Sequence, residues 1–306
     1  MIVIQRVASR PLIRQQLKNA VFVGMGVAGA IGRLSQLRRS SVDTSGMLRV
    51  LMYHRVNRQR IDAYTISPHR LRRHLALLAA SYEVVSPGAV LRSIEGRSPL
   101  PDRAVLLTFD DAYLDHYENA YPILRDLGLQ AVLFVSTDHI GERGTDHGRG
   151  RIDTSSEGRT LDWAHLREMR DVFTVGSHGM SHQMLTRIPR ATAAFEIVES
   201  KRLLEKQLGE TVSFFSYPYG KPSAYDQELD GLVRAAGYRA SFVTVGGANS
   251  LDHLWSGSAL RRHGTESLSD FALARVLDGS CDMIQGAHIR YRQWAVSRRE
   301  AAAASG

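Results

Sequence analysis

From residue 47 onward, short apolar segments alternate with longer segments of helical periodicity, and this alternation constrains the fold more than any other feature. The predicted strands are residues 48–54, 82–86, 105–109, 131–136, 173–177, 214–217 and 240–245. The predicted helices between them are residues 68–80, 117–127, 161–170, 190–208 and 224–236. Gly128, Gly209 and Gly237 are placed to stop three of these helices. Strand–helix alternation of this kind predicts an α/β fold whose parallel sheet is closed or nearly closed.

Two adjacent aspartates, Asp110 and Asp111, directly follow the predicted strand at 105–109. A carboxylate at the buried end of a strand needs a cation or hydrogen bonds to compensate for lost solvation. Because side chains alternate along a strand, one aspartate can hold a cation while its neighbour faces a water. An ordinary acidic turn is the alternative, and the pair alone does not exclude it.

Two histidines, His178 and His182, follow the predicted strand at 173–177 with a spacing of four residues. Histidines four apart can converge on one cation, although a helix face or a core histidine produces the same spacing. With a carboxylate added, they form the donor set of a catalytic zinc-type site that leaves a position open for water. The next strand runs into a turn with Pro218 and Tyr219, whose backbone N–H groups could face a developing oxyanion; a plain β-turn is the alternative.

Five motifs together resemble the polysaccharide deacetylase family with the NodB homology domain, carbohydrate esterase family 4. In the family's order and spacing, they are Leu-Met-Tyr-His-Arg-Val at 51–56, Thr-Phe-Asp-Asp-Ala-Tyr at 108–113, the histidine motif at 177–182, Tyr-Pro-Tyr-Gly at 217–220 and Leu-Arg-Arg at 260–262. The resemblance covers about residues 47–280. It implies an irregular, TIM-like (β/α) barrel of the NodB type, and the motifs fall at strand C-terminal ends, where barrel enzymes build their sites.

The resemblance implies a metal-dependent hydrolase of carbon–nitrogen bonds other than peptide bonds, which removes acetyl from an N-acetylated amino sugar in a poly- or oligosaccharide. It makes Asp111, His178 and His182 the metal ligands and Asp110 the general base. Zinc is the expected ion, with cobalt, nickel or another divalent ion as alternatives. The backbone N–H of Tyr219, beside Pro218, would stabilise the oxyanion.

One departure from the family pattern concerns the residue that orients the base. Many members have an arginine shortly before the Pro-Tyr-Gly turn, whereas Ser216 and Tyr217 occupy that neighbourhood here. Arg262 is the candidate replacement that would orient Asp110. A surface arginine is the alternative.

A second departure concerns the general acid, because the C-terminal Leu-His motif that supplies it in many relatives has no clear match. His263 and His288 are the nearest histidines, and neither stands in the expected context. Asp110 could carry the proton both ways, or His54, which we group with the substrate-facing residues, could donate it. The missing acid keeps a second function open: a catalytically impaired carbohydrate-binding or scaffold protein on the same barrel.

The net charge of +8 is concentrated near the N-terminus. Residues 1–60 hold 11 of the 39 basic residues and one of the 31 acidic residues, a net charge of +10. The other 246 residues hold 28 basic and 30 acidic side chains, a net charge of −2. This balance argues against a basic groove across the catalytic region, so no nucleic-acid partner is expected.

We predict three parts: a basic arm with a short apolar segment at 1–46, the catalytic domain at 47–285 and a C-terminal tail at 286–306. The apolar stretch at 20–31 is too short to span a membrane as a plain helix. We expect the arm to lie on an anionic membrane surface, with the protein cytoplasmic or peripheral to the cytoplasmic membrane. Export by a signal peptide is one alternative and a loosely ordered helix is another. Cys281 is the single cysteine, so no internal disulfide forms, and the oligomeric state is left open.

Overall fold

The computed structural model describes residues 47–60, 62–96, 99–141, 159–279 and 282. The described residues up to 267 form one compact unit, and those from 268 onward belong to a second. In the second unit, the described helix is α9 (Asp270–Leu277), and the Ser269 hydroxyl accepts a hydrogen bond from the Ala272 N–H at its start. The predicted three-part division at residues 46 and 285 stays a prediction.

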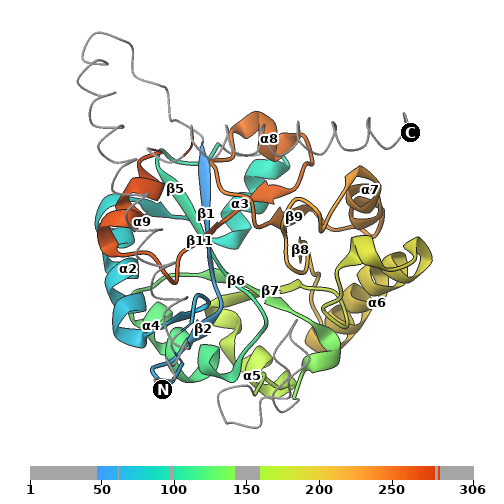
Figure 1. The fold of residues 1–306 in the computed structure, drawn as a ribbon, viewed down its shortest axis with the longest axis horizontal. Coiled ribbons are helices and arrows are strands. Elements are labelled where there is room, and N and C mark those ends of the chain that lie inside the picture. Colours follow the sequence, from blue (N-terminus) through green and yellow to red (C-terminus); the bar gives the residue numbers. More distant parts are fainter. Residues whose placement is uncertain (1–46, 61, 97–98, 142–158, 280–281, 283–306) are drawn as a thin grey trace, which may run out of the picture. The chain divides into compact units, whose positions relative to one another are not determined.

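Eight parallel strands of the first unit form a nearly closed barrel (Figure 1). Their order is β10 (Leu260–Arg261), β9 (Ala240–Val243), β8 (Phe214–Ser216), β7 (Phe173–Ser177), β6 (Ala131–Val135), β5 (Ala104–Phe109), β1 (Leu48–Tyr53) and β11 (His263–Gly264). In addition, β4 (Glu83–Val84) pairs with β5. The predicted irregular (β/α) barrel is confirmed.

The two edges of the barrel sheet are joined by two short strands with a single residue between them. β10 pairs with β9, whereas β11 pairs with β1, and only Arg262 separates β10 from β11 along the chain. The two short strands therefore connect the opposite edges of the sheet.

Helices lie outside the strands, where they cover the barrel (Figure 1). They are α2 (Pro68–Ser81), α4 (Tyr121–Asp126), α5 (Trp163–Glu168), α6 (Arg190–Leu208) and α7 (Gln227–Ala235). The side chains of Ser67, Asp162 and Asp226 accept hydrogen bonds from the first turns of α2, α5 and α7. α6 has the predicted bounds and ends at Gly209, which has a φ of 71°.

The predicted helix at 117–127 is divided. A π-helical turn, η1 (His116–Ala120), precedes α4. Pro122 has no N–H, and its ring cannot accommodate the carbonyl four residues earlier, so the regular α-helical ladder is interrupted at this point. The N–H of Tyr121 instead donates to the carbonyl of His116.

Smaller elements complete the described part of the barrel unit. β2 (Arg55–Val56) pairs with β3 (Thr65–Ile66), and two further helices are α3 (Pro87–Ile94) and α8 (Leu251–Trp255). Short 3-10 turns are η2 (Thr137–His139), η4 (Met169–Asp171) and η5 (Leu185–Arg187). No helix among the described residues is long and apolar enough to cross a membrane.

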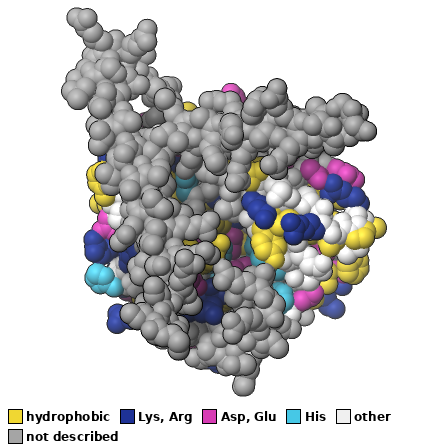
Figure 2. Space-filling view, viewed as in Figure 1, with side chains coloured by type: hydrophobic (Ala, Val, Ile, Leu, Met, Phe, Trp, Pro, Cys, Tyr) yellow, Lys and Arg dark blue, Asp and Glu magenta, His cyan; other side chains and the backbone are white. Residues whose placement is uncertain are grey.

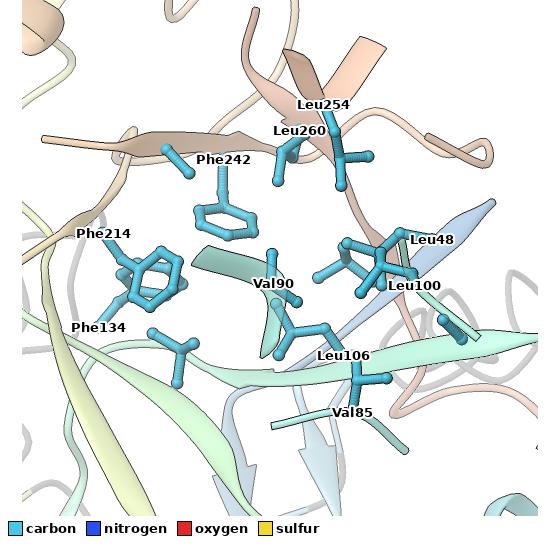
Figure 3. Packing of buried hydrophobic residues seen from close by; sticks show 14 residues of the cluster. Leu48, Val85, Val90, Leu100, Leu106, Phe134, Phe214, Phe242, Leu254 and Leu260 are labelled. Atoms are coloured by element: carbon cyan, nitrogen blue, oxygen red, sulfur yellow. The ribbon is translucent and has the colours of Figure 1, made fainter. Parts of the chain in front are cut away.

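Apolar side chains pack together inside the barrel (Figure 3). The strands contribute Leu48, Val50, Leu106, Val132, Phe134, Phe214, Phe242 and Leu260, which are at most 1% exposed. Val90 of α3 and Leu254 of α8 pack into the same cluster. The inner residues alternate along each strand with residues that face the helices, as the pleat of a strand requires.

The same alternation brings polar side chains to the inner face nearer the C-terminal ends of the strands. Two residues beyond Leu106, Phe214 and Leu260 lie Thr108, Ser216 and Arg262, and two residues beyond Thr108 lies Asp110. All four polar side chains are buried. The functional side chains therefore stand on a packed apolar layer.

Charged groups are interspersed on the described surface of the view in Figure 2. Lys and Arg side chains lie next to hydrophobic, acidic and histidine side chains there. The charges of this visible part of the face are therefore mixed and do not form a patch of one sign.

Candidate active site

Three of the predicted site residues, Asp111, His178 and His182, lie together beyond the C-terminal ends of β5 and β7. One ligand atom from each lies within 4.8 Å of the others, and all three side chains are buried. The Nε2 atoms of His178 and His182 lie 3.7 and 3.4 Å from Oδ1 of Asp111. Two imidazole nitrogens and one carboxylate oxygen suit a catalytic divalent ion with an open coordination position. The donor set therefore fits a metal ion, although it does not identify which one.

A backbone carbonyl orients the first histidine. Nδ1 of His178 lies 2.7 Å from the carbonyl oxygen of Ser216. Because a carbonyl can only accept, Nδ1 carries the proton and Nε2 presents its lone pair toward Asp111. Burial lowers the pKa of His178, although the charges of Asp110 and Asp111 oppose this, so the ring is neutral as a ligand requires.

The turn between the two histidines is held by Glu196 of α6. Its Oε2 accepts hydrogen bonds from the N–H groups of Met180 and Ser181 at 2.8 and 3.0 Å, and its Oε1 accepts from the Ser181 hydroxyl. Gly179 has a φ of 76°, and a Cβ there would lie 3.3 Å from Oε2 of Glu196. Glu196 therefore fixes the backbone path that brings both histidines to one place.

Asp110 forms a buried, two-pronged ion pair with Arg262. Nη1 and Nη2 of Arg262 donate to the two carboxylate oxygens at 2.7 and 2.8 Å, and Arg262 is 1% exposed. Its Nη2 also donates to the Ser216 hydroxyl at 2.8 Å, and its Nη1 to the Thr108 hydroxyl at 3.2 Å. The structure thus places Arg262 against Asp110, and the alternative of a surface arginine is wrong.

The environment of Asp110 keeps it ionised. Burial alone raises the pKa of the carboxyl, but the charge of Arg262, with a smaller contribution from the charge of His54, outweighs burial and lowers the pKa below its usual value. Asp110 is therefore a carboxylate at neutral pH. The adjacent aspartates have different partners, as the alternation along the strand predicts.

Backbone strain is concentrated at this site. Five described residues other than glycine have a positive φ, and four of them are Asp111, Ala112, His182 and Tyr219; Arg103 is the fifth. Residues with side chains rarely adopt this left-handed conformation, and they retain it only where the surroundings enforce it. The geometry of the site therefore overrides local backbone preference.

The turn after β8 places Tyr219 beside the histidines. Pro218 is buried, Tyr219 is 40% exposed, and its ring centroid lies 5.1 Å from that of His182. A Cβ at Gly220 would lie 2.6 Å from the backbone nitrogen of Thr244, so this position requires glycine. The role of the Tyr219 N–H as an oxyanion donor stays a prediction.

His54 follows β1 and is paired with Glu266. Its Nδ1 lies 2.6 Å from Oε1 of Glu266, a carboxylate that is 3% exposed. Burial of the imidazole lowers its pKa, but Glu266, with smaller contributions from Asp111 and Asp110, outweighs burial and raises the pKa of His54 to about 9. His54 is therefore protonated at neutral pH.

Two glutamates that support the site could not be identified from the sequence. Glu266 is 212 residues from His54, and Glu196 lies on a helix among several other charged residues. By contrast, His263 is a structural residue, because its Nε2 accepts a hydrogen bond from the Gly247 N–H at 2.9 Å. His288 lies outside the described residues.

Comparison with known proteins agrees with the motifs. Residues 97–241 match the family model described as polysaccharide deacetylase. The chain is 25% identical over 228 residues to YxkH of Bacillus subtilis, a protein named as a polysaccharide deacetylase. The match covers 71% of this chain and 74% of that protein. It is 25% identical over 159 residues to a poly-beta-1,6-N-acetyl-D-glucosamine N-deacetylase of Staphylococcus aureus. That match covers 48% of this chain and 49% of the relative, which is about half the relative's length.

Solved structures share the fold. The deacetylase PplD of Streptococcus pyogenes, solved with acetate, has a TM-score of 0.63 at 23% identity, with 76% of this chain and 99% of that chain covered. IcaB of Ammonifex degensii has a TM-score of 0.63 at 23% identity, with 76% of this chain and 96% of that chain covered. The barrel is therefore a fold that these deacetylases also adopt.

Replacing Arg262 by methionine is expected to destabilise the protein, because it leaves the Asp110 carboxylate buried without its partner. We expect the free energy of unfolding to fall by about 3–5 kcal/mol at pH 7. Burial would then raise the pKa of Asp110 above its unfolded value, so the folded variant takes up a proton as the pH falls and the loss becomes smaller at pH 5. Urea unfolding of metal-free protein at both pH values measures this.

The double variant Asp110→Asn, Arg262→Met is the matched control, because it removes both charges. It should recover part of the lost free energy and show a smaller pH dependence of the difference from the parent. A single Arg262→Met variant as stable as the parent at pH 7 would contradict the expected dependence on this ion pair.

Proposed function

We propose that this chain, of which residues 97–241 match the polysaccharide deacetylase family model, is a metal-dependent hydrolase that removes acetyl from an N-acetylated amino sugar in a poly- or oligosaccharide. One observation carries the proposal: two adjacent aspartates have separate partners. Asp111 lies with the two histidines, and Asp110 lies with Arg262. The name of the staphylococcal relative makes poly-N-acetylglucosamine the first substrate to test.

Asp110 would act as the general base. Arg262 holds both of its carboxylate oxygens, which fixes their direction, and its lowered pKa keeps it ready to accept a proton at neutral pH. It would take that proton from water as the oxygen attacks the acetyl carbonyl carbon. A divalent ion held by Asp111, His178 and His182, for which we propose zinc with cobalt or nickel as substitutes, would supply Lewis-acid polarisation of the carbonyl and of the water.

The remaining steps need an oxyanion donor and an acid. The N–H of Tyr219 would stabilise the oxyanion of the tetrahedral intermediate. His54 would donate its proton to the sugar nitrogen as the carbon–nitrogen bond breaks, which releases acetate and a free amine. The short contact between His54 and Glu266 favours His54 over Asp110 as the acid, because it keeps the imidazole protonated.

We expect metal-stripped protein to release acetate from N-acetylglucosamine oligomers only after zinc or cobalt is returned. Asp110→Asn should lower the rate by about 10²–10⁴-fold, because it removes the base. The same variant should still bind the metal, since Asp110 is not among the three proposed ligands. Acetate assays with β-1,4 and β-1,6 oligomers, alongside metal titrations, measure both effects.

Asp111→Asn is the companion variant and should lose metal affinity as well as activity. Tight metal binding without acetate release from any oligomer would contradict the proposed hydrolase. That result would favour a carbohydrate-binding or scaffold protein on the same barrel.

Glu266→Gln is expected to move the alkaline limb of the pH–rate profile. His54 must be protonated to donate, so in the parent activity is present below its pKa of about 9 and is lost as the pH rises through that value. Without the Glu266 charge, the largest contribution that opposes burial is lost, so the pKa of His54 falls below about 9. The alkaline limb of the kcat/KM profile should therefore lie at a lower pH in the variant than in the parent.

Glu199→Gln is the matched control, since this glutamate pairs with Arg202 on the outer helix α6. Its profile should keep the alkaline limb of the parent. If Glu266→Gln also keeps that limb, His54 is not the acid whose ionisation controls the rate.

We propose that the basic arm at 1–46, which lies outside the described residues, contacts an anionic membrane surface. Residues 1–46 hold seven basic residues and one acidic residue, a net charge of +6, which supports this contact. It would place the protein in the cytoplasm or peripheral to the cytoplasmic membrane, with export as the alternative. We expect the full chain to sediment with vesicles rich in anionic lipid at about 0.05 M salt and to dissociate at about 0.5 M. Equal binding to neutral vesicles would contradict the electrostatic contact.

A further inference from the structure

The hydroxyl of Tyr113 links Asp111 to a buried arginine. It donates to Oδ2 of Asp111 at 3.2 Å and accepts a hydrogen bond from Nη2 of Arg55 at 2.9 Å. The guanidinium carbon of Arg55 lies 4.3 Å from the centroid of the Tyr113 ring. Arg55, Tyr113 and Asp111 are 4%, 2% and 7% exposed, so these contacts form where hydrogen bonds are strong and water competes little.

The direction of the central hydrogen bond is fixed by the chemistry of the groups. Arginine has N–H donors and no acceptor, so Arg55 must donate to the Tyr113 oxygen. The tyrosine proton is then free to point toward the carboxylate of Asp111, which can only accept when ionised. The guanidinium therefore also determines how the hydroxyl is oriented.

The contact falls on the oxygen of Asp111 that is remote from the histidines. Oδ1 is the atom 3.7 and 3.4 Å from the two Nε2 atoms, whereas Oδ2 accepts from Tyr113. A carboxylate that offers one oxygen to a cation can rotate unless its second oxygen is held. The backbone of this turn also needs support, because Asp111 and Ala112 have φ values of 72° and 49° in the left-handed region, which residues with side chains rarely adopt.

The chain also anchors both ends of this link. Tyr113 forms an isolated antiparallel bridge with Thr160. Beyond Arg55, the N–H of Val56 and the side-chain amide of Asn57 both donate to Oδ2 of Asp115 at 3.0 and 2.8 Å. The segment that carries the arginine is therefore tied to the turn that carries the tyrosine.

We propose that Tyr113 and Arg55 are positioning residues of the metal centre. Tyr113 holds Asp111 in the orientation that presents Oδ1 beside the two histidines, and Arg55 holds the Tyr113 hydroxyl in its donating orientation. The inference rests on the proposed function only in requiring that Asp111 bind a metal ion. It does not require that the protein release acetate.

Tyr113→Phe is the decisive variant, because it removes one hydroxyl and leaves the ring that packs against Arg55. We expect its zinc affinity, measured by competition with a chromogenic chelator, to fall by about 10–100-fold. The visible absorption spectrum of the cobalt-loaded variant should also change, because the orientation of one ligand changes. Neither measurement depends on turnover.

Tyr121→Phe is the matched control. The hydroxyl of Tyr121 also donates to a carboxylate, at 3.0 Å from Oδ1 of Asp171, which is not part of the metal cluster. Its zinc affinity and cobalt spectrum should equal those of the parent. Thermal unfolding of each metal-free variant identifies any general loss of structure.

Arg55→Met tests the second half of the link. Its zinc affinity should fall, and the double variant Arg55→Met, Tyr113→Phe should bind zinc as tightly as Tyr113→Phe alone. Additive losses would overturn the role of Arg55, because they would show that it acts independently of the hydroxyl. Unchanged zinc affinity in Tyr113→Phe would overturn the whole inference.

These outcomes are separable from those of the proposed function. A parent that binds no metal would overturn both the metal centre and this inference. A parent that binds metal but releases no acetate, with affinity lost in Tyr113→Phe, would support the positioning role while the hydrolase proposal fails.

Discussion

The buried ion pair between Asp110 and Arg262 is the interaction on which the site and the closure of the barrel both depend. Removing two charges from water costs several kcal/mol per ion, and only good geometry with further hydrogen bonds offsets that cost. Here the pairing is two-pronged, and the hydroxyls of Thr108 and Ser216 accept the remaining hydrogen bonds of the two terminal nitrogens. Arg262 is also the single residue between β10 and β11, so the residue that connects the sheet edges also holds the proposed base.

The proposed metal centre is supported by several separate parts of the barrel. The carbonyl of Ser216, at the end of β8, orients His178, and Glu196 of α6 holds the turn between the histidines. The turn after β5 holds Asp111 through Tyr113. Each ligand is thus restrained by groups that do not themselves lie in the cluster, which is how a barrel assembles precise sites from strand ends.

Much of this architecture was predictable from the sequence, because buried parallel strands read as continuous apolar runs. The strands β5, β7 and β8 lie within one residue of their predicted bounds, and the helix at Arg190–Leu208 has the predicted bounds. β10 and β11 were not predicted, since two residues each are too few for any periodicity. The spacing of the two histidines indicated a possible metal site, and the resemblance indicated Asp111 as the third ligand and Arg262 as the partner of Asp110. Glu196 and Glu266 could not be found, because isolated acids gain meaning only when the fold brings them to a partner.

The closure of the barrel explains why Glu266, which the sequence did not reveal, and Arg262, which it did, lie in one short segment. β11 pairs with β1 so that Gly264 lies opposite Met52. Two residues farther along, just past the ends of both strands, the same register brings Glu266 near His54, and the observed contact follows. Two residues back along the chain from Gly264, Arg262 enters the barrel and meets Asp110. One short segment, 262–266, therefore provides the partners of both groups proposed to transfer protons. Ser216 and Tyr217 stand before the Pro-Tyr-Gly turn in this chain, and the guanidinium reaches Asp110 from the residue between β10 and β11. A buried carboxylate needs a compensating charge, and the closure of the barrel supplies one through the residue that joins the two edges of the sheet.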